Sequence, residues 1–282
     1  MGNKKKILIS IASVIAVVAI YFIYESFMFV TTDNAGIQAH TLMIASKVPG
    51  IVTEVLVDEN QIVKEGDVLV KIDQRDYVNQ VALAEADLGS SDARMKDAET
   101  NFARLKSLYH GGAVSQQQYD TANTLFKSES KKNAAAHAQV DQAQLNLAYT
   151  EIKAPVNGFI ARRSVEKGQV VPPGQPLLGF VSSESRWVIA NFKETDLSHI
   201  KLGAKATVGV DSLDGQIYEG VVDSISPSTG STFTLLPPDN ATGNFTKVVQ
   251  RVPVKIKLLN LKPEDTTKLQ VGLSVEVSIK TR

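Results

Sequence analysis

The chain has 282 residues, enough for more than one domain, and its 30 basic and 30 acidic residues balance to a formal net charge of zero. This balance argues against nucleic acid as a partner, because nucleic-acid-binding proteins usually carry a basic patch or stripe. The chain contains no cysteine, which excludes a disulfide framework, thiol catalysis and cysteine-ligated metal sites.

The N-terminus carries three consecutive lysines followed by an apolar stretch. Residues 7–24 are apolar except for Ser10 and Ser13, and a helix of this length would span about 27 Å of a hydrocarbon core about 30 Å thick. The lysines predict a cytoplasmic N-terminus. A cleaved signal peptide is the competing interpretation, but no small-residue cleavage site follows the long apolar run. We therefore expect an uncleaved, single-pass anchor over residues 1–30, with the bulk of the chain outside the cytoplasm.

After a short extended lead-in over residues 31–46, a β-rich segment occurs twice in the chain. Residues 50–73 match the segment that begins at Gly158 without a gap when the numbering is shifted by 108. Both copies show short apolar runs separated by turn residues, a pattern typical of strands. Neither copy can bury its apolar face alone. We therefore expect residues 47–73 and 152–182 to form two halves of one small β-domain.

Between these halves, over residues 74–151, the apolar residues are spaced alternately by four and three. This is the heptad seam of a coiled coil, and it occurs on both sides of the Gly111-Gly112 break. Ser115 and Gln118 have the spacing of a capping box at the start of the second helix. We expect an antiparallel helical hairpin with arms of about 35 residues, or roughly 50 Å. Glu129 and Asn133 fall in the seam and should weaken it midway.

Residues 183–282 return to strand patterns and predict a small β-barrel. A polar loop over residues 226–246 interrupts them, and loops of this length are usually functional or mobile. Three apolar residues within this loop, Phe233, Leu235 and Leu236, are predicted either to contact a neighbouring subunit or a membrane partner, or to cap the end of the barrel.

The sequence shows no constellation that carries catalysis. The four histidines do not share the spacing of metal ligands, and Gly111-Gly112 lacks the Lys-Ser/Thr of a phosphate-binding loop. No paired carboxylates or activated nucleophile have supporting context. We therefore expect no enzyme, no cofactor and no metal site.

The two β-halves resemble the fold of lipoyl and biotinyl carrier domains. Those carriers modify a lysine on the turn between the halves, whereas the helical hairpin replaces that turn here. Lys71 and Lys153 flank the insertion and are interpreted as ordinary surface residues. Acyl or carboxyl carriage is therefore the disfavoured alternative.

The order of the segments resembles the membrane fusion proteins, or periplasmic adaptors, of the HlyD family. Residues 188–195 (VIANFKET) and the segments within 233–254 (FTLLP, NATGNF and KVVQRVPV) narrow the resemblance to adaptors of the EmrA type, and Thr32-Asp33-Asn34-Ala35 also fits. The implied fold is mixed α and β, elongated and multidomain. It comprises an N-terminal transmembrane helix, a lipoyl-like β-sandwich split by the coiled-coil hairpin, and a C-terminal β-barrel.

The resemblance also implies a location and partners. The protein would lie in the inner membrane of a Gram-negative bacterium and form a homo-oligomeric ring, a hexamer in this family. It would link a major-facilitator exporter to a TolC-type outer-membrane channel, for efflux of drugs or other small molecules. An ABC-type or resistance-nodulation pump is the alternative partner, and a membrane-anchored coiled-coil scaffold without an export role is the alternative function.

Three residues around the predicted hairpin turn are candidates for docking the outer channel. Arg104, Leu108 and Ser115 match the Arg-x3-Leu-x6-Ser pattern of adaptors that dock TolC-type channels. Arg104 and Leu108 are one helical turn apart and share a face just outside the seam. The alternative interpretation is a solvated arginine, a leucine packed over the turn and a serine that serves only as a helix cap.

Overall fold

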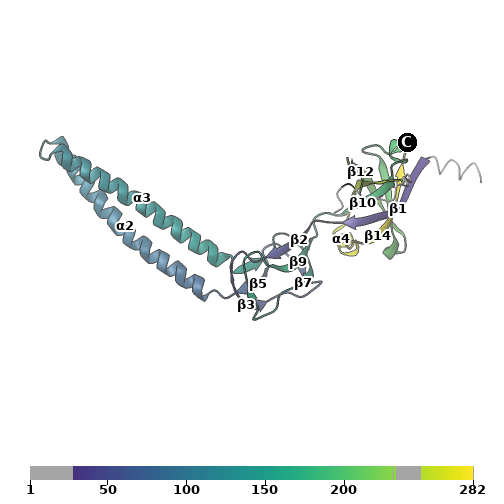
Figure 1. The fold of residues 1–282 in the computed structure, drawn as a ribbon, viewed down its shortest axis with the longest axis horizontal. Helices are drawn as coiled ribbons and strands as arrows, with labels where there is room; N and C mark the ends of the chain where they lie inside the picture. The colour runs from purple at the N-terminus through teal and green to yellow at the C-terminus, as the bar shows by residue number, and fades with distance from the viewer. Residues whose placement is uncertain (1–27, 231, 233–248, 282) are drawn as a thin grey trace, which may run out of the picture. The chain divides into compact units, whose positions relative to one another are not determined.

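A computed structural model describes residues 28–230, 232 and 249–281 (Figure 1). The chain forms two compact units, one of residues 41–181 and the other of the described residues up to His40 together with those from Ser182 onward. The expected anchor over residues 1–30, apart from its last three residues, lies outside the described residues, as do Phe233, Leu235 and Leu236. Of the helices within the described ranges, none combines the length and apolar character needed to span a membrane.

The first unit contains two four-stranded sheets that enclose a common apolar core. One sheet has the order β2 (Thr41–Ala45), β9 (Pro176–Ser182), β7 (Gly158–Arg163) and β4 (Ile62–Val63). The other has the order β6 (Glu151–Lys153), β5 (Val68–Ile72), β3 (Gly50–Val55) and β8 (Val170–Val171). Each sheet therefore takes strands from both sides of the helical insertion, as expected for two halves that cannot bury their apolar faces alone.

The glycine repeated at positions 50 and 158 has a physical cause in close packing between strands. A Cβ atom on Gly50 would collide with the side chain of Ile72, and one on Gly158 would collide with the ring of Phe180. Ile72 and Phe180 are themselves equivalent positions of the repeat, and both are buried. The repeat therefore preserves one packing contact in each half of the sandwich.

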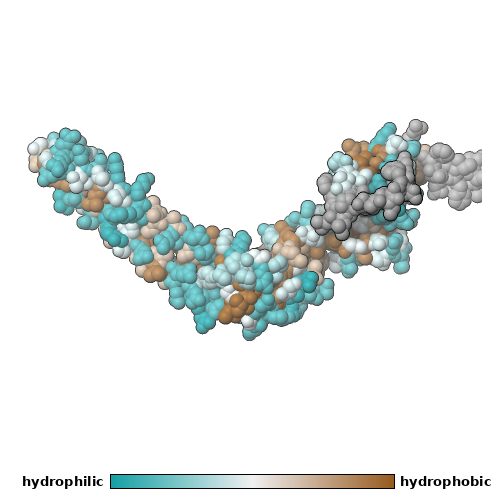
Figure 2. Space-filling model, viewed as in Figure 1, coloured by the Kyte–Doolittle hydropathy of each residue, from teal (hydrophilic) through white to brown (hydrophobic). Residues whose placement is uncertain are grey.

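The insertion forms two long helices, α2 (Arg75–His110) and α3 (Gln116–Ala148), which pack along each other. This confirms the predicted helical hairpin. The fully buried residues all lie at seam positions: Ala84, Ser91 and Ala98 in α2, and Ala122, Glu129, Asn133, Val140 and Ala143 in α3. Small seam residues allow the helices to approach closely, and the outward surface of the hairpin is mainly hydrophilic (Figure 2).

The two seam residues that we expected to weaken the hairpin, Glu129 and Asn133, both have polar partners. The Asn133 side-chain amide donates a hydrogen bond to Asp92 Oδ1 at 2.5 Å, and Lys132 Nζ pairs with Glu129 Oε1 at 2.7 Å. The predicted polar interruption is therefore present, and its buried groups are hydrogen-bonded.

The second unit contains a closed six-stranded barrel. Its order is β1 (Phe29–Gln38), β10 (Trp187–Lys193), β13 (Arg251–Leu258), β12 (Gln216–Ile225), β11 (Lys205–Val210) and β14 (Ser274–Lys280), which returns to β1. Its described residues also form three short helices: η1 (Leu197–His199), η2 (Asp211–Leu213) and α4 (Pro263–Lys268).

The structure divides the segment that we expected to be a separate lead-in over residues 31–46. Its first part is β1, a strand of the barrel, in which Ala35 and Ile37 are buried. Its second part is β2, which pairs with β9 in the sandwich. Phe29 and Val30, which we assigned to the anchor, also belong to β1 and pair with β14. β1 closes the barrel because it pairs with β10 along one edge and with β14 along the other.

Candidate docking site at the hairpin tip

Residues 111–115 reverse the chain between α2 and α3. The N–H of Gly111 donates to the carbonyl of Ser107 at 3.2 Å, and that of Ala113 donates to the carbonyl of Leu108 at 2.9 Å. Gly112 has φ of +72°, a left-handed conformation that favours glycine. These contacts satisfy carbonyls at the end of α2 and make the turn tight.

Ser115 begins α3 with the predicted capping box. Its Oγ accepts a hydrogen bond from the Gln118 N–H at 3.3 Å, and its own N–H donates to Gln118 Oε1 at 3.0 Å. The cap therefore occupies the serine side chain. Any docking role of Ser115 would come in addition to this structural one.

Four aromatic rings in the seam brace the helices below the turn. The rings of Tyr109 and Tyr119 stack with centroids 5.0 Å apart, and those of Phe102 and Phe126 stack at 5.6 Å. Phe102 and Tyr119 join the two pairs at 5.7 Å. Aromatic contacts of this kind stabilise a structure by more than their buried area alone would give. They therefore hold the two helices together at the tip. The heptad pattern placed these residues in the seam, but it did not predict that they stack.

Arg104 and Leu108 both face solvent near the end of α2. Leu108 is 42% exposed although its backbone carbonyl is engaged in the turn. Arg104 is also exposed, and the ion pairs found in the described part of the chain do not include it. The structure thus keeps these two candidates together on one helical face, with Ser115 across the turn.

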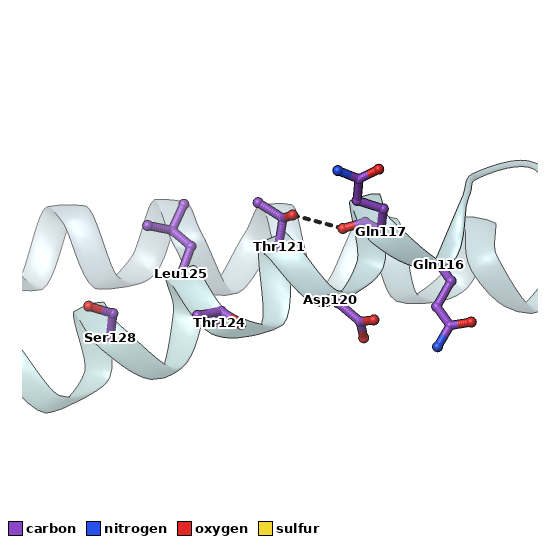
Figure 3. A pocket seen from close by; sticks show the side chains of 7 residues that line it. All are labelled: Gln116, Gln117, Asp120, Thr121, Thr124, Leu125 and Ser128. Atoms are coloured by element: carbon purple, nitrogen blue, oxygen red, sulfur yellow. Dashed lines mark hydrogen bonds between the residues drawn. The ribbon is translucent and has the colours of Figure 1, made fainter.

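A shallow groove on α3 adjoins the tip and was not anticipated from the sequence. Its volume is about 790 Å³, and it is lined by Gln116, Gln117, Asp120, Thr121, Thr124, Leu125 and Ser128. Figure 3 shows these side chains in two rows with a spacing of four residues, one of Gln117, Thr121 and Leu125 and one of the others. Leu125 is 47% exposed, and Asp120 is the one charged residue of the lining.

This groove offers a partner a surface different from that of an ordinary solvated helix. Rows of side chains spaced by four residues form the ridges between which another helix can pack. The short polar side chains present hydroxyl and amide groups without a strong charge. The available signal in the sequence was the scarcity of charged residues between Gln116 and Ser128. Among the described residues, no three His, Asp or Glu side chains are close enough together to hold a metal ion.

Comparison with known proteins identifies the family to which the chain belongs. The family model described as "RND MFP, barrel-sandwich hybrid domain", where MFP stands for membrane fusion protein, matches residues 40–182. The matched range nearly coincides with the sandwich-and-hairpin unit. The chain belongs to the membrane fusion proteins. The resemblance inferred from the sequence is therefore confirmed.

Two relatives place this membrane fusion protein with the EmrA type of the HlyD family. The colistin resistance protein EmrA of Acinetobacter baumannii is 31% identical, over 99% of this chain and 96% of that protein. The multidrug export protein EmrA of Escherichia coli K12 is also 31% identical, over 94% of this chain and 80% of that protein. A solved structure of the periplasmic adaptor protein EmrA shares the fold, with a TM-score of 0.51 at 20% identity over 90% of this chain and 98% of that one.

Proposed function

We propose that this membrane fusion protein is a periplasmic adaptor for efflux, which links an inner-membrane exporter of the major-facilitator type to a TolC-type outer-membrane channel. The observation that carries the proposal is the two-helix arm, whose braced tip presents Arg104 and Leu108 to solvent. The names of the EmrA relatives, which refer to drug resistance and multidrug export, support the export role. The family is in general non-catalytic, so the protein would contribute assembly rather than chemistry.

At the channel end, the proposed contact combines one apolar and one charged group. Leu108 would pack into an apolar depression of the channel, while the Arg104 guanidinium would donate hydrogen bonds to carbonyl or carboxylate oxygens. Ser115 would keep α3 capped beside them. The groove of α3, which is lined mainly by uncharged side chains and lies close to the same tip, would widen the contact.

At the membrane end, the proposal assigns residues 1–30 to a single-pass inner-membrane anchor with a cytoplasmic N-terminus and a periplasmic remainder. Phe233, Leu235 and Leu236 are proposed to contact the pump or a neighbouring subunit. The EmrA-like strand segments on either side of that loop support this assignment, because β10 and β13 are neighbours in the barrel, with Val188 opposite Ile256 and Phe192 opposite Val252.

Two further features belong to the proposal. The adaptor would act as a homo-oligomeric ring, a hexamer by resemblance, because one narrow arm cannot enclose a conduit. The matched domain carries the resistance-nodulation name, which leaves a pump of that class as the alternative inner-membrane partner.

The test uses cells that lack other adaptors. Arg104→Asp and Leu108→Ser should each abolish efflux while far-UV circular dichroism of the purified proteins shows the same helix content as the unchanged protein. The matched controls are Arg94→Asp and Leu83→Ser, which change exposed residues of α2 away from the tip and should leave efflux intact.

Ser115→Ala tests the structural role of the helix cap. It should lower the stability of the hairpin by about 1 kcal/mol, the usual cost of losing a serine cap. Full efflux by Arg104→Asp and Leu108→Ser at normal expression would remove the docking role from the tip. Equal loss of efflux in the two control variants would show that the arm is sensitive everywhere and would also contradict a specific site.

A further inference from the structure

One end of the barrel carries a hollow of about 380 Å³ that three lysines line. Lys201 lies in the turn before β11, Lys205 begins β11, and Lys280 ends β14. β11 and β14 are paired, with Ala206 opposite Ile279, so Lys205 and Lys280 occupy the same end of neighbouring strands. Among the described residues, those that line the hollow include no acidic side chain. The hollow therefore concentrates positive charge in one place.

The three lysines have no anionic partner in the part of the chain that the structure describes. The acidic residues Glu194, Asp196 and Asp223 belong to the same end of the barrel, but none of them lines the hollow. Asp223 is itself paired with Lys255 at 3.4 Å. The hollow is therefore available to an anion that comes from outside the chain.

Exposed apolar side chains accompany the lysines. The turn before β11 is closed by the N–H of Ala204, which donates to the carbonyl of Lys201 at 3.1 Å. Gly203 has φ of +78°, the left-handed conformation that the third position of a type II turn requires. The residue before it, Leu202, lines the hollow and is 67% exposed. Phe29, directly opposite the lysine that ends β14, is 37% exposed. Single exposed apolar residues are normal, but here they stand among unpaired cations.

The hollow also lies where the chain enters the barrel. The N–H and the hydroxyl of Thr281, which lines the hollow, donate to the carbonyl of Met28 at 2.9 and 3.0 Å. The first and last described residues therefore lie at the same end of the barrel (Figure 1). The apolar stretch assigned to the anchor ends at Tyr24, four residues before Met28, and four residues reach at most about 14 Å. An anchored chain would thus keep the hollow close to the bilayer surface.

We propose that this hollow binds the anionic headgroups of phospholipids on the periplasmic side of the membrane that holds the anchor. The lysine ammonium groups would lie among the lipid phosphates, and Leu202 would enter the boundary between headgroups and acyl chains. The proposal rests on the anchor included in the proposed function and adds a lipid partner to it. The exposed apolar side chains and the short connection to the anchor favour a lipid surface over an acidic patch on another protein.

Such a contact would set the orientation of the barrel. A single covalent connection limits the distance between the barrel and the membrane, but it leaves the barrel free to tilt. Lys201 and Lys205 lie on one side of the hollow and Lys280 lies on the neighbouring strand, so lipid contacts at all three would resist tilting.

The test measures the reactivity of individual lysines in the full-length protein placed in lipid nanodiscs. Reductive methylation followed by mass spectrometry should modify Lys201, Lys205 and Lys280 about tenfold more slowly in phosphatidylglycerol than in phosphatidylcholine. This expectation follows because each lysine near an anionic surface contributes roughly a fivefold factor to binding. Lys268 in α4, on the connection from β13 to β14 at the opposite end of the barrel, should react equally in both lipids. Lys193, which ends β10 at the same end as the hollow but outside it, controls for mere proximity to a charged bilayer.

Three outcomes of this measurement would overturn the proposal. One is an equal rate for the three lysines in the two lipids. Another is a slowing of Lys193 as large as theirs, which would show an effect of the charged surface rather than of the hollow. The third is equal protection in phosphatidylcholine nanodiscs when inorganic phosphate is added, which would show a site for free anions.

A charge variant tests whether the lysines act together. In phosphatidylglycerol, Lys205→Gln should raise the reaction rates of Lys201 and Lys280 about fivefold, because one of the three cations that hold the headgroups is gone. Lys193→Gln is the matched control and should leave those rates unchanged. Undiminished protection in Lys205→Gln would contradict a shared site.

Leu202→Ser tests the apolar part of the contact and should also speed the reaction of the three lysines. The matched control is Ile217→Ser, because Ile217 is 69% exposed but lies opposite Gly209, four positions along β11 from Lys205. An equal effect of the two serine variants would remove the role of Leu202 at the lipid surface.

Lipid protection and efflux are separate measurements, so the two proposals can fail separately. Efflux by the unchanged protein without any protection of the lysines would overturn the lipid contact alone. A protein that does not enter nanodiscs would contradict the anchor, and phosphatidylglycerol vesicles then replace the nanodiscs. Protection by these vesicles would keep the lipid site, and no protection would overturn it.

Discussion

At the scale of single residues, neighbouring positions on one helix have opposite roles. Leu105 is partly buried in the seam, whereas Leu108, one turn further on, is exposed. The difference follows from the heptad, in which only two positions in seven point at the partner helix. A leucine outside the seam at the end of an arm is therefore free to pack against a partner, which is why the docking proposal depends on Leu108 rather than on its neighbour.

A second residue-scale feature lies at the root of the hairpin, where β5 leads into α2. Arg75 pairs with Asp73 at 2.6 Å, and the backbone N–H of Arg75 also donates to Asp73 Oδ1 at 3.1 Å. The side-chain hydrogen bond from Arg75, followed by the backbone one, lowers the pKa of Asp73 from 3.8 to about 2. Because the folded pKa is depressed, the stabilising contribution is complete above the unfolded pKa and is lost as the pH falls toward about 2.

We predict that Arg75→Gln raises the pKa of Asp73 toward its ordinary value, with a remaining depression from the backbone hydrogen bond. The change should be measured by following the Asp73 carboxyl carbon by NMR between pH 1.5 and 6, roughly the range in which a carboxyl group titrates. Arg94→Gln, on the exposed face of α2, is the control and should leave that pKa unchanged. An Asp73 pKa still near 2 in Arg75→Gln would show that the guanidinium is not its cause.

At the scale of elements, the seam of the hairpin contains a polar layer that lowers its stability. Buried polar seam residues usually fix the register of a coiled coil at a cost in stability. Here Asn133 reaches out to Asp92, which is itself exposed. Removal of the amide would therefore return Asp92 to water rather than leave it buried without a partner.

We predict that Asn133→Leu stabilises the hairpin by about 1 kcal/mol, because an apolar side chain replaces a buried amide. Urea unfolding of the full-length protein, followed by far-UV circular dichroism, measures the change. His137→Leu is the control on the outward face of α3, where the effect should stay within about 0.5 kcal/mol. A marked destabilisation by Asn133→Leu would show that the layer holds the helices in register.

At the scale of the whole molecule, the sandwich is arranged so that the hairpin can be removed. The helices leave after β5 and return before β6, and these two strands pair directly, with Val70 opposite Ile152 and Lys71 opposite Glu151. The Ile72 N–H also donates to the Thr150 carbonyl at 2.9 Å. The two ends of the insertion are therefore close enough for a short turn to join them.

We predict that replacing residues 75–150 with a short Gly-Ser turn leaves a folded β-protein that supports no efflux. Circular dichroism should show the loss of helix, and thermal denaturation should remain cooperative, because both sheets and their core are retained. A protein without a cooperative transition would show that the sandwich depends on the hairpin for folding.

The sequence by itself determined the features whose signals are local or repeated. The heptads predicted two helices and their buried faces, Ser115 and Gln118 predicted the cap, and the internal repeat predicted paired β-halves. The docking candidates Arg104 and Leu108 followed from the same heptad together with a family pattern. All these patterns operate within a few turns of helix or compare one segment with another, so they can be recognised without knowledge of the fold.

Only the tertiary structure decided which distant segments meet. Alternation in β1 indicates which side chains are buried but does not name the partner strands, and these prove to be β10 and β14, far away in the chain. For the same reason the stack of Tyr109 on Tyr119, which joins α2 to α3, could not be predicted. It depends on side chains brought together from two helices, where packing, rather than periodicity, sets the geometry.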